Sequence, residues 1–189
     1  FVTLFLGFFD TRTGVLEYSN AGHPSPYMLR SGGIERIDGR PDAPLGVRRD
    51  TVYRSRTVTL QPGDAVFVCT DGVAEAMNVG DEHYTDQRLD ADLRAAYAAA
   101  PADIIRMVKE HVDTFSGSAP KADDVTMLAL RWQPRGAGQP EDPVVPRMTF
   151  AGETMGRSAA PAALRQTIDL VIRNETTELA HLSAALERI

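Results

Sequence analysis

Two acidic motifs, far apart in the chain, each place carboxylates at the end of an apolar strand. The segment 70–76, T-D-G-V-A-E-A, closes the apolar run 65–70, and the segment 122–126, A-D-D-V-T, opens another strand. Carboxylates held close together repel one another by about 4 kcal/mol at 4 Å when the effective dielectric constant is near 20. A fold that gathers them usually binds a hard divalent cation. Metal-assisted phosphate chemistry is therefore the first hypothesis for this chain.

Each motif also has an ordinary explanation when it is taken alone. Asp71 precedes Gly72, which lets the backbone approach a ligand closely and leaves its own carbonyl unobstructed, but Thr-Asp-Gly is more often a simple turn. Asp123 and Asp124 open a strand, although an acidic pair in a loop is usually just solvated. Adjacent carboxylates point in different directions, so we expect one to bind an ion and its neighbour to support it or to bind a further ion.

Composition narrows the class of protein. The 189 residues are 43% apolar and 7% aromatic, enough for one full core plus a fragment or for two small domains. The net charge of −6 argues against nucleic acid and anionic membrane as partners, because both need clustered Lys and Arg. We expect neither a membrane span nor a signal peptide, and since the chain opens within an apolar run, we expect its natural N-terminus to lie upstream of Phe1.

The single cysteine, Cys69, excludes an internal disulfide and a cysteine-based zinc site, which fits a cytoplasmic protein. Because Cys69 lies inside the apolar run 65–70, we expect an inert thiol in the core. One histidine, His23, lies within a motif. The others have no companion ligands and are expected at the surface: His83, His111 and His181.

Apolar runs and turn signals predict a sheet-rich first part of the chain. Hairpin signals stand at 10–14 and 31–33, and a turn signal at 61–64 precedes a run typical of a strand buried on both faces. The expected strands are residues 2–9, 15–19, 27–30, 34–37, 52–60, 65–70 and 125–132.

Two helices are expected between the last two of these strands. Apolar residues recur at helical spacing from Leu89 to Tyr97 and again from Ile104 to Phe115. Pro101 is expected to open the second helix, where its missing N–H costs nothing.

The composition then divides the chain into a domain at 1–133, a linker at 134–166 and a further segment at 167–189; residues 134–146 of the linker are rich in Pro, Gly and polar residues. That segment predicts a half-buried strand over 167–173 and a helix capped by Asn174. The helix carries its apolar residues on one stripe: Leu179, Leu182, Leu186 and Ile189. A strand and one helix bury too little surface to fold alone, so this reads as the beginning of a second domain.

A third motif, the segment 20–26 with sequence N-A-G-H-P-S-P, precedes the two acidic motifs. Together the three resemble the PPM-type metal-dependent Ser/Thr phosphatases, specifically the bacterial SpoIIE/RsbU-like branch. That branch carries N-A-G-H-x-P, then a strand ending in T-D-G-x-x-E-A, then helices and a D-D-x-T strand. Residues 1–133 match this layout without obvious gaps, and the combined match is far more specific than any one piece.

The resemblance implies an α+β fold in which two antiparallel sheets, flanked by helices, hold a dinuclear Mn²⁺ or Mg²⁺ site between them. It implies that Asp71, Gly72 and Asp123 belong to the metal site, with Asp124 an adjacent ligand or a supporting residue. Two cations can acidify a bridging water into a nucleophile and neutralise the phosphate oxygens during in-line attack, so no protein nucleophile is required.

Two further residues are candidates for catalysis, each with a structural alternative. His23 would orient the phosphate or donate a proton, or it is a hydrogen-bonded histidine that holds its loop. Glu75 would contact metal-bound water, or it favours the start of a short helical turn.

The chain also departs from the family pattern. These phosphatases carry an upstream motif, D-V-x-G-x-G, whose Asp bridges the two metals, and no segment of the chain corresponds to it. We therefore expect these residues to hold about half of the metal shell, to bind metal weakly and to show little or no phosphatase activity alone.

The function that the resemblance implies is hydrolysis of phosphoserine or phosphothreonine on a regulatory protein, namely a STAS-type anti-sigma factor antagonist in a partner-switching pathway. A homodimer is one assembly that this allows. The segment 168–189 resembles the first strand and helix of the GHKL-type ATPase domains of anti-sigma kinases. Two alternatives stay open: a regulatory or scaffold module with an incomplete metal site, and a hydrolase of small phosphate esters.

Overall fold

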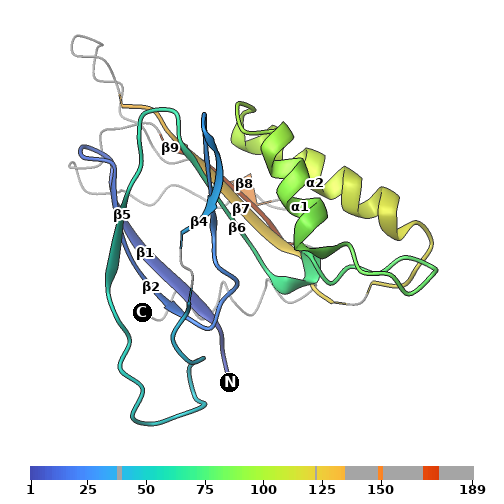
Figure 1. The fold of residues 1–189 in the computed structure, drawn as a ribbon, viewed down its shortest axis with the longest axis horizontal. Coiled ribbons are helices and arrows are strands. Elements are labelled where there is room, and N and C mark those ends of the chain that lie inside the picture. Colours follow the sequence, from blue (N-terminus) through green and yellow to red (C-terminus); the bar gives the residue numbers. More distant parts are fainter. Residues whose placement is uncertain (38–39, 122, 135–148, 151–167, 175–189) are drawn as a thin grey trace.

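The structure, a computed structural model, describes residues 1–37, 40–121, 123–134, 149–150 and 168–174. It has two β-sheets, and a pair of helices covers one of them (Figure 1). The strands are β1 (Leu4–Asp10), β2 (Val15–Ala21), β3 (Tyr27–Arg30), β4 (Gly33–Arg36), β5 (Arg56–Thr59), β6 (Ala65–Cys69), β7 (Thr126–Trp132), β8 (Thr149–Phe150) and β9 (Ile168–Asn174). The helices are η1 (Asp71–Val73), α1 (Thr85–Ala95) and α2 (Pro101–Ser116). The predicted α+β class with two antiparallel sheets is confirmed.

The smaller sheet has the order β1-β2-β5 and the larger the order β4-β3-β6-β7-β9-β8. Among the described strands, every pairing is antiparallel except that of β8 with β9. The predicted central strand is β6, which lies between β3 and β7. Its position explains the continuous apolar run, since a strand in the middle of a covered sheet buries both faces.

Strand β6 separates two apolar cores by the alternation of its side chains. Phe67 and Cys69 point to the core shared with the helices, whereas Val66 points to the core between the two sheets. The inter-sheet core also contains Leu16 of β2 and Trp132 of β7. The strand that leads to Asp71 is therefore fixed from both sides.

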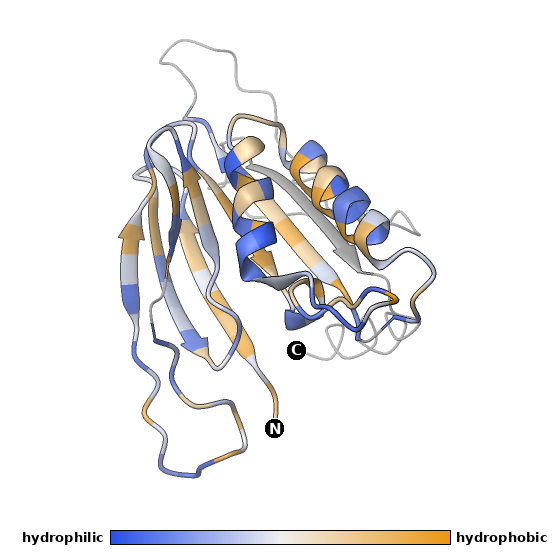
Figure 2. Cartoon of the chain, turned by 45° about the vertical axis from the view of Figure 1, so that its right-hand side comes forward, coloured by the Kyte–Doolittle hydropathy of each residue, from blue (hydrophilic) through white to orange (hydrophobic). Residues whose placement is uncertain are grey.

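The two helices cover the larger sheet with their apolar faces, as the hydropathy colouring shows (Figure 2). In α2 the buried residues are Pro101, Ile104, Ile105, Val108 and Val112, a stripe at helical spacing. Pro101 lies at the start of the helix, as predicted. No helix among the described segments combines the length and apolar character needed to cross a membrane.

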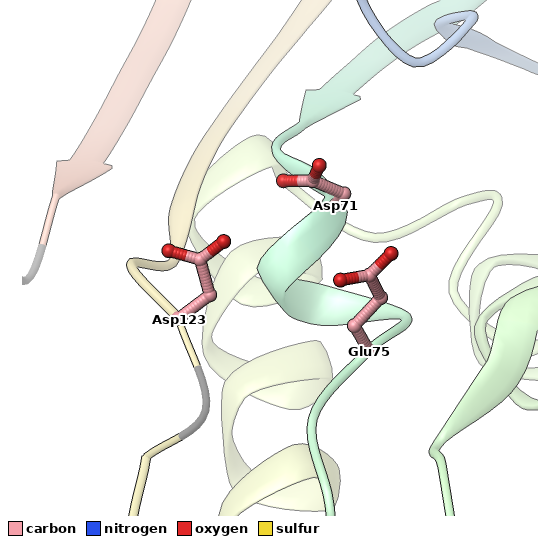
Figure 3. A group of neighbouring side chains, drawn as sticks. All are labelled: Asp71, Glu75 and Asp123. Atoms are coloured by element: carbon pink, nitrogen blue, oxygen red, sulfur yellow. The ribbon is translucent and has the colours of Figure 1, made fainter.

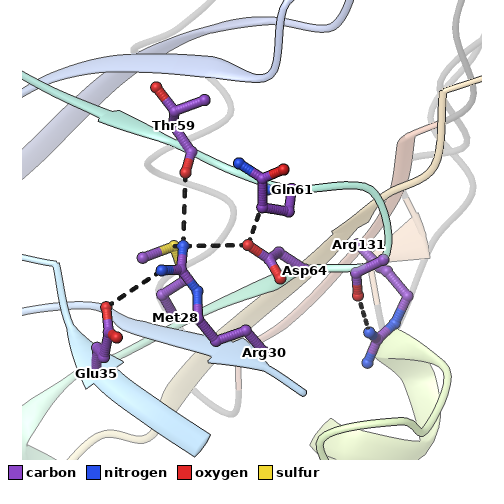
Figure 4. Close-up of polar contacts among 8 residues, drawn as sticks. Met28, Arg30, Glu35, Thr59, Gln61, Asp64 and Arg131 are labelled. Atoms are coloured by element: carbon purple, nitrogen blue, oxygen red, sulfur yellow. Dashed lines mark hydrogen bonds and ion pairs between the residues drawn. The ribbon is translucent and has the colours of Figure 1, made fainter. Parts of the chain in front are cut away.

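A polar cluster fixes the turn in front of β6 (Figure 4). Asp64, only 4% exposed, accepts hydrogen bonds from Arg30 at 3.1 Å and from the backbone N–H of Gln61 at 2.8 Å. Arg131 donates to the carbonyls of Gly63 and, at 2.8 Å, of Ala99. The start of β6 is thus tied both to β3 and to the connection between α1 and α2.

One strand is much shorter than predicted: the expected strand over 52–60 is regular only as β5, at Arg56–Thr59. Beyond Tyr18, the edge of β2 is taken by another segment, because the backbone N–H of Asp42 donates to the Asn20 carbonyl at 2.9 Å. Val52 is accordingly 79% exposed. A local pattern cannot reveal this competition for the strand edge.

The predicted strand over 167–173 is present as β9, which pairs with β7 in the larger sheet. The predicted linker lies largely outside the described residues, and the helix expected after Asn174 lies wholly outside them. The domain division and the GHKL resemblance therefore stay predictions.

Candidate metal centre

Three carboxylates from the two acidic motifs meet at one end of the larger sheet (Figure 3). Asp71, Glu75 and Asp123 each offer an oxygen, and these oxygens lie within 4.8 Å of one another. Asp71 opens η1 directly after β6, and the Glu75 backbone N–H donates to the Asp71 carbonyl at 2.9 Å, which places both side chains on one side of the turn. Asp123 comes from the segment before β7. All three side chains are exposed to solvent.

Gly72 brings the two motifs into backbone contact. It is buried, and a Cβ added to it would lie 2.5 Å from the carbonyl oxygen of Asp124 and 3.1 Å from its carbonyl carbon. A real Cβ essentially never lies within 3.0 Å of another heavy atom, so the 2.5 Å contact would force the backbone to shift. The glycine of T-D-G is thus required by the close approach of the D-D segment, independently of any ligand.

Thr70 connects the same two segments by hydrogen bonds. Its hydroxyl donates to the Asp124 carbonyl at 3.0 Å and accepts from the Thr126 N–H at 3.0 Å. Its backbone N–H also donates to the Thr126 carbonyl at 3.0 Å. This role of Thr70 was not predicted from the sequence, although a threonine hydroxyl both donates and accepts hydrogen bonds and can serve neighbouring backbone groups.

Asp124 does not join the carboxylate cluster. Its carbonyl is the group that meets Thr70 and Gly72, and its N–H donates to Oδ1 of Asp123 at 2.7 Å. Its exposed side chain is not among the three that converge. Of the predicted acidic ligands the structure therefore brings together Asp71 and Asp123, adds Glu75, and leaves Asp124 aside.

The N-A-G-H segment is shaped by its asparagine. Asn20 is fully buried, accepts from the His23 N–H at 2.8 Å and donates to the His23 carbonyl at 3.0 Å. Gly22 has φ +76°, and a Cβ there would lie 2.5 Å from Cγ of Pro44. This role of Asn20 was not predicted from the sequence, although an Asn side chain that hydrogen-bonds the nearby backbone is a known turn signal.

His23 is held through its backbone, so the asparagine, rather than the imidazole, holds the loop. The imidazole Nδ1 lies 3.5 Å from the hydroxyl of Thr3. Burial lowers the pKa of His23, and the negative charge of Asp71 opposes this in part. Its ring is therefore biased toward the neutral form beside the carboxylate cluster.

The remaining histidines and the cysteine lie as expected where the structure describes them. His83 and His111 are exposed, and His111 Nδ1 is 2.7 Å from a carboxylate oxygen of Asp92. His181 lies outside the described residues. Cys69 is 8% exposed, which confirms its predicted position in the core, and burial raises its pKa to about 12.

The cluster fits a hard divalent cation in donor type and nearly in size. At cation–oxygen distances of about 2.1 Å, two ligand oxygens stand at most about 4.2 Å apart. The oxygens of the cluster lie within 4.8 Å of one another, so a contraction of at most about 0.6 Å suffices. Rotation of exposed carboxylates provides such a change. Without a cation, each pair of charges repels by about 1 kcal/mol at the dielectric constant of water.

Two antiparallel sheets, helices on the outer face of one of them, and a carboxylate cluster at the ends of β6 and β7 together define the class of PP2C-type metal-dependent phosphatase folds. The family described as Stage II sporulation protein E (SpoIIE) matches residues 1–133. The chain therefore belongs to the SpoIIE family of PP2C-type serine/threonine phosphatases.

Individual relatives agree with this assignment. Protein IcfG of Synechocystis sp. is 30% identical over 130 residues, which are 69% of this chain and 20% of IcfG. The structure of the RsbU and RsbW domains of Rv1364c from Mycobacterium tuberculosis is 26% identical with a TM-score of 0.56, over 71% of this chain and 37% of that one. The manganese-soaked phosphatase domain of SpoIIE from Bacillus subtilis shares the fold, with 17% identity, a TM-score of 0.56, and coverage of 71% of this chain and 58% of that one. The chain thus spans a fifth of the curated relative and just over half of the solved SpoIIE domain.

Proposed function

We propose that this chain carries part of the catalytic centre of a metal-dependent phosphatase that removes phosphate from serine or threonine on a regulatory protein. The observation that carries the proposal is the convergence of Asp71, Glu75 and Asp123, built by backbone contacts between two motifs of the family. Groups of exposed carboxylates are common in proteins without a bound ion. Its position on the T-D-G and D-D-V-T segments of a SpoIIE-family chain makes it a candidate centre.

The residues have distinct parts in this proposal. Asp71 and Asp123 hold Mn²⁺ or Mg²⁺, and Glu75 contributes a third oxygen or orients water. A bound divalent cation supplies Lewis acidity toward phosphate oxygens and lowers the pKa of coordinated water. His23, biased toward its neutral form, is available to accept or relay a proton near Asp71. Cys69 takes no part, because its thiol is buried and its pKa is raised.

Completion of the centre by residues outside this chain belongs to the same proposal. Three carboxylates are few for two hard cations with about six ligands each, even when water fills several positions. The missing D-V-x-G-x-G motif would supply the bridging carboxylate, and Asp124 or the Gly72 carbonyl would serve as additional ligands. We therefore expect weak metal binding and little turnover from residues 1–189 alone.

The proposed substrate is a phosphorylated STAS-type protein of a partner-switching pathway in the cytoplasm. Its support is the likeness, at 26% identity, to a protein that carries both an RsbU and an RsbW domain. We extend the proposal to a GHKL domain beginning near residue 167 and to a homodimer. The apolar outer face of β1, where Leu4, Leu6 and Phe8 are 42–71% exposed, supports self-association.

The test is Mn²⁺-dependent release of phosphate from a phosphoserine STAS protein by this chain and by a longer chain with its natural upstream residues. We expect turnover from the longer chain, and loss by a factor of hundreds in D71N. The matched control D103N removes a carboxylate on the exposed surface of α2, where a surface ion pair contributes little. Equal turnover by the two lengths would refute the incomplete centre, and an active D71N would refute the metal role. Preference for a small phosphate ester over the phosphoprotein would favour a hydrolase of small phosphate esters. If D71N still released the partner protein as the wild type does, a non-catalytic scaffold module would be favoured.

A further inference from the structure

A cavity of about 190 Å³ opens beside the carboxylate cluster, between η1, the C-terminal half of α2 and the segment before β7. It shares Gly72 and Asp123 with the candidate metal centre. Its other walls come from α2 and from the loop after it, including Ser116 and Ala119. Whatever occupies the cavity is therefore in contact with the edge of the metal site.

The walls of the cavity are mainly apolar. Its lining includes the side chains of Ala76, Met77, Val112, Val125 and Met127. A dry apolar cavity of about 150 Å³ holds a benzene ring, so this volume fits one medium apolar side chain. It is smaller than the roughly 300 Å³ or more of pockets that enclose a whole small molecule.

The charged groups around the cavity balance one another. Lys109, Lys121, Asp113 and Asp123 all line it, and Nζ of Lys109 lies 2.7 Å from a carboxylate oxygen of Asp113. Two positive and two negative charges leave no net attraction for an ionic group. An uncharged apolar group is therefore the occupant that the lining favours.

We propose that this cavity is a specificity pocket that takes one aliphatic or methionine side chain of the phosphoprotein substrate, from a position within three residues of the phosphorylated residue. The inference rests on the proposed function, because it takes the neighbouring cluster as the place where the phosphate binds. Three residues of extended chain span at most about 11 Å, which limits the distance between the phosphate and the pocket. Met77 lines the pocket and is partly exposed, and a flexible thioether adapts to side chains of different shape.

The experiment measures binding, so it does not depend on turnover. Fluorescein-labelled phosphoserine peptides with a Gly/Ser background carry a single Leu at each position from −3 to +3, and fluorescence anisotropy is recorded with Mn²⁺ and the longer chain that includes the natural upstream residues. We expect one position to bind about 10- to 100-fold more tightly with Leu than with Gly, the range that burial of one such side chain provides. A119L fills the pocket and removes this preference. The control A102L adds the same side chain at an exposed position of α2 and keeps it.

Each outcome decides the matter. A preference that is absent at every position, or that persists undiminished in A119L, overturns the specificity pocket. If A119L loses its cooperative thermal transition, S116L fills the same pocket from the end of α2 and gives the same test. A different result would refute the proposed function. In that case the Leu preference would remain, but peptide affinity would change neither when the phosphate is removed nor when Mn²⁺ is removed.

Discussion

Replacing Gly72 by Ala tests whether backbone contact between the two acidic motifs builds the candidate metal centre. The new Cβ would lie 2.5 Å from the Asp124 carbonyl oxygen, whereas ordinary contacts begin near 3.4 Å. One of the two segments must therefore move by roughly 0.5 to 0.9 Å. Overpacking of this kind typically costs about 1–3 kcal/mol of unfolding free energy.

The same movement separates the ligands. Metal–ligand distances tolerate deviations of only about 0.2 Å, and a backbone shift of about 0.5 Å or more between Asp71 and Asp123 adds to the adjustment that the exposed side chains already make to close around a cation. We expect the affinity of G72A for Mn²⁺ to fall about 10- to 100-fold, as when a group that orients a ligand is removed. Isothermal titration with Mn²⁺ and urea unfolding measure the two effects.

Gly32 provides the matched control, because a Cβ there meets no atom within 4 Å and its φ is not positive. G32A is expected to change the unfolding free energy by no more than about 0.5 kcal/mol. A G72A protein with the urea midpoint and Mn²⁺ affinity of G32A would refute the reasoning, since the motifs would then have room to spare.

Three further predictions concern neighbouring groups. T70V removes the hydroxyl that bonds the Asp124 carbonyl and the Thr126 N–H, so urea unfolding is expected to show a loss of about 1–3 kcal/mol that T70S largely restores. Cys69 is expected to stay unreactive toward a disulfide reagent in the native protein at pH 8. Because its pKa is raised from 9 in the unfolded chain to about 12 in the folded protein, its contribution to the free energy of unfolding is complete below pH 9 and is lost between pH 9 and 12. The C69A protein is expected to lack this pH dependence. His23 has a folded pKa below its usual 6.5, so the metal-free protein is expected to lose stability as the pH falls below about 6.5, and thermal melting of H23Q without that slope supports the assignment.

The fold could be predicted largely because its central strand has a strong local signature. The run 65–70 is apolar on both faces, and the short loops between the strands that precede it carry residues typical of hairpins. The prediction of a strand over 52–60 was wrong in its first half, because Asp42 occupies the edge of β2 with which that half would have paired. Such competition depends on segments that meet only after folding.

The sequence predicts which motifs form the site, but not which side chain of each motif takes part. Neighbouring residues of an extended segment point in opposite directions, so the sequence cannot show whether Asp123 or Asp124 faces Asp71. The choice is made by Thr70 and Gly72, which hold the Asp124 carbonyl against β6 and leave the Asp123 side chain on the side of the cluster. Long-range packing thus decides which carboxylate takes part.

Substitutions at Asp71 and Gly72 can therefore distinguish a residue that binds the metal from a residue that only positions the metal ligands. Asp71 contributes repulsion in the metal-free protein, and D71N keeps the side-chain oxygen that accepts the Gly72 N–H at 3.1 Å. Relief of one or two charge pairs, reduced by solvent screening, is expected to raise the metal-free stability of D71N by up to about 1 kcal/mol. Because a cation that binds only the folded state stabilises it by mass action, D71N is also expected to lose most of the Mn²⁺-induced rise in melting temperature.

Replacing a structural residue such as Gly72 instead lowers both the metal-free stability and the Mn²⁺-induced rise in melting temperature. Thermal melting of D71N and G72A with and without Mn²⁺ distinguishes the two kinds of residue, and a D71N protein that is less stable than wild type without metal would show that Asp71 holds the fold rather than the ion.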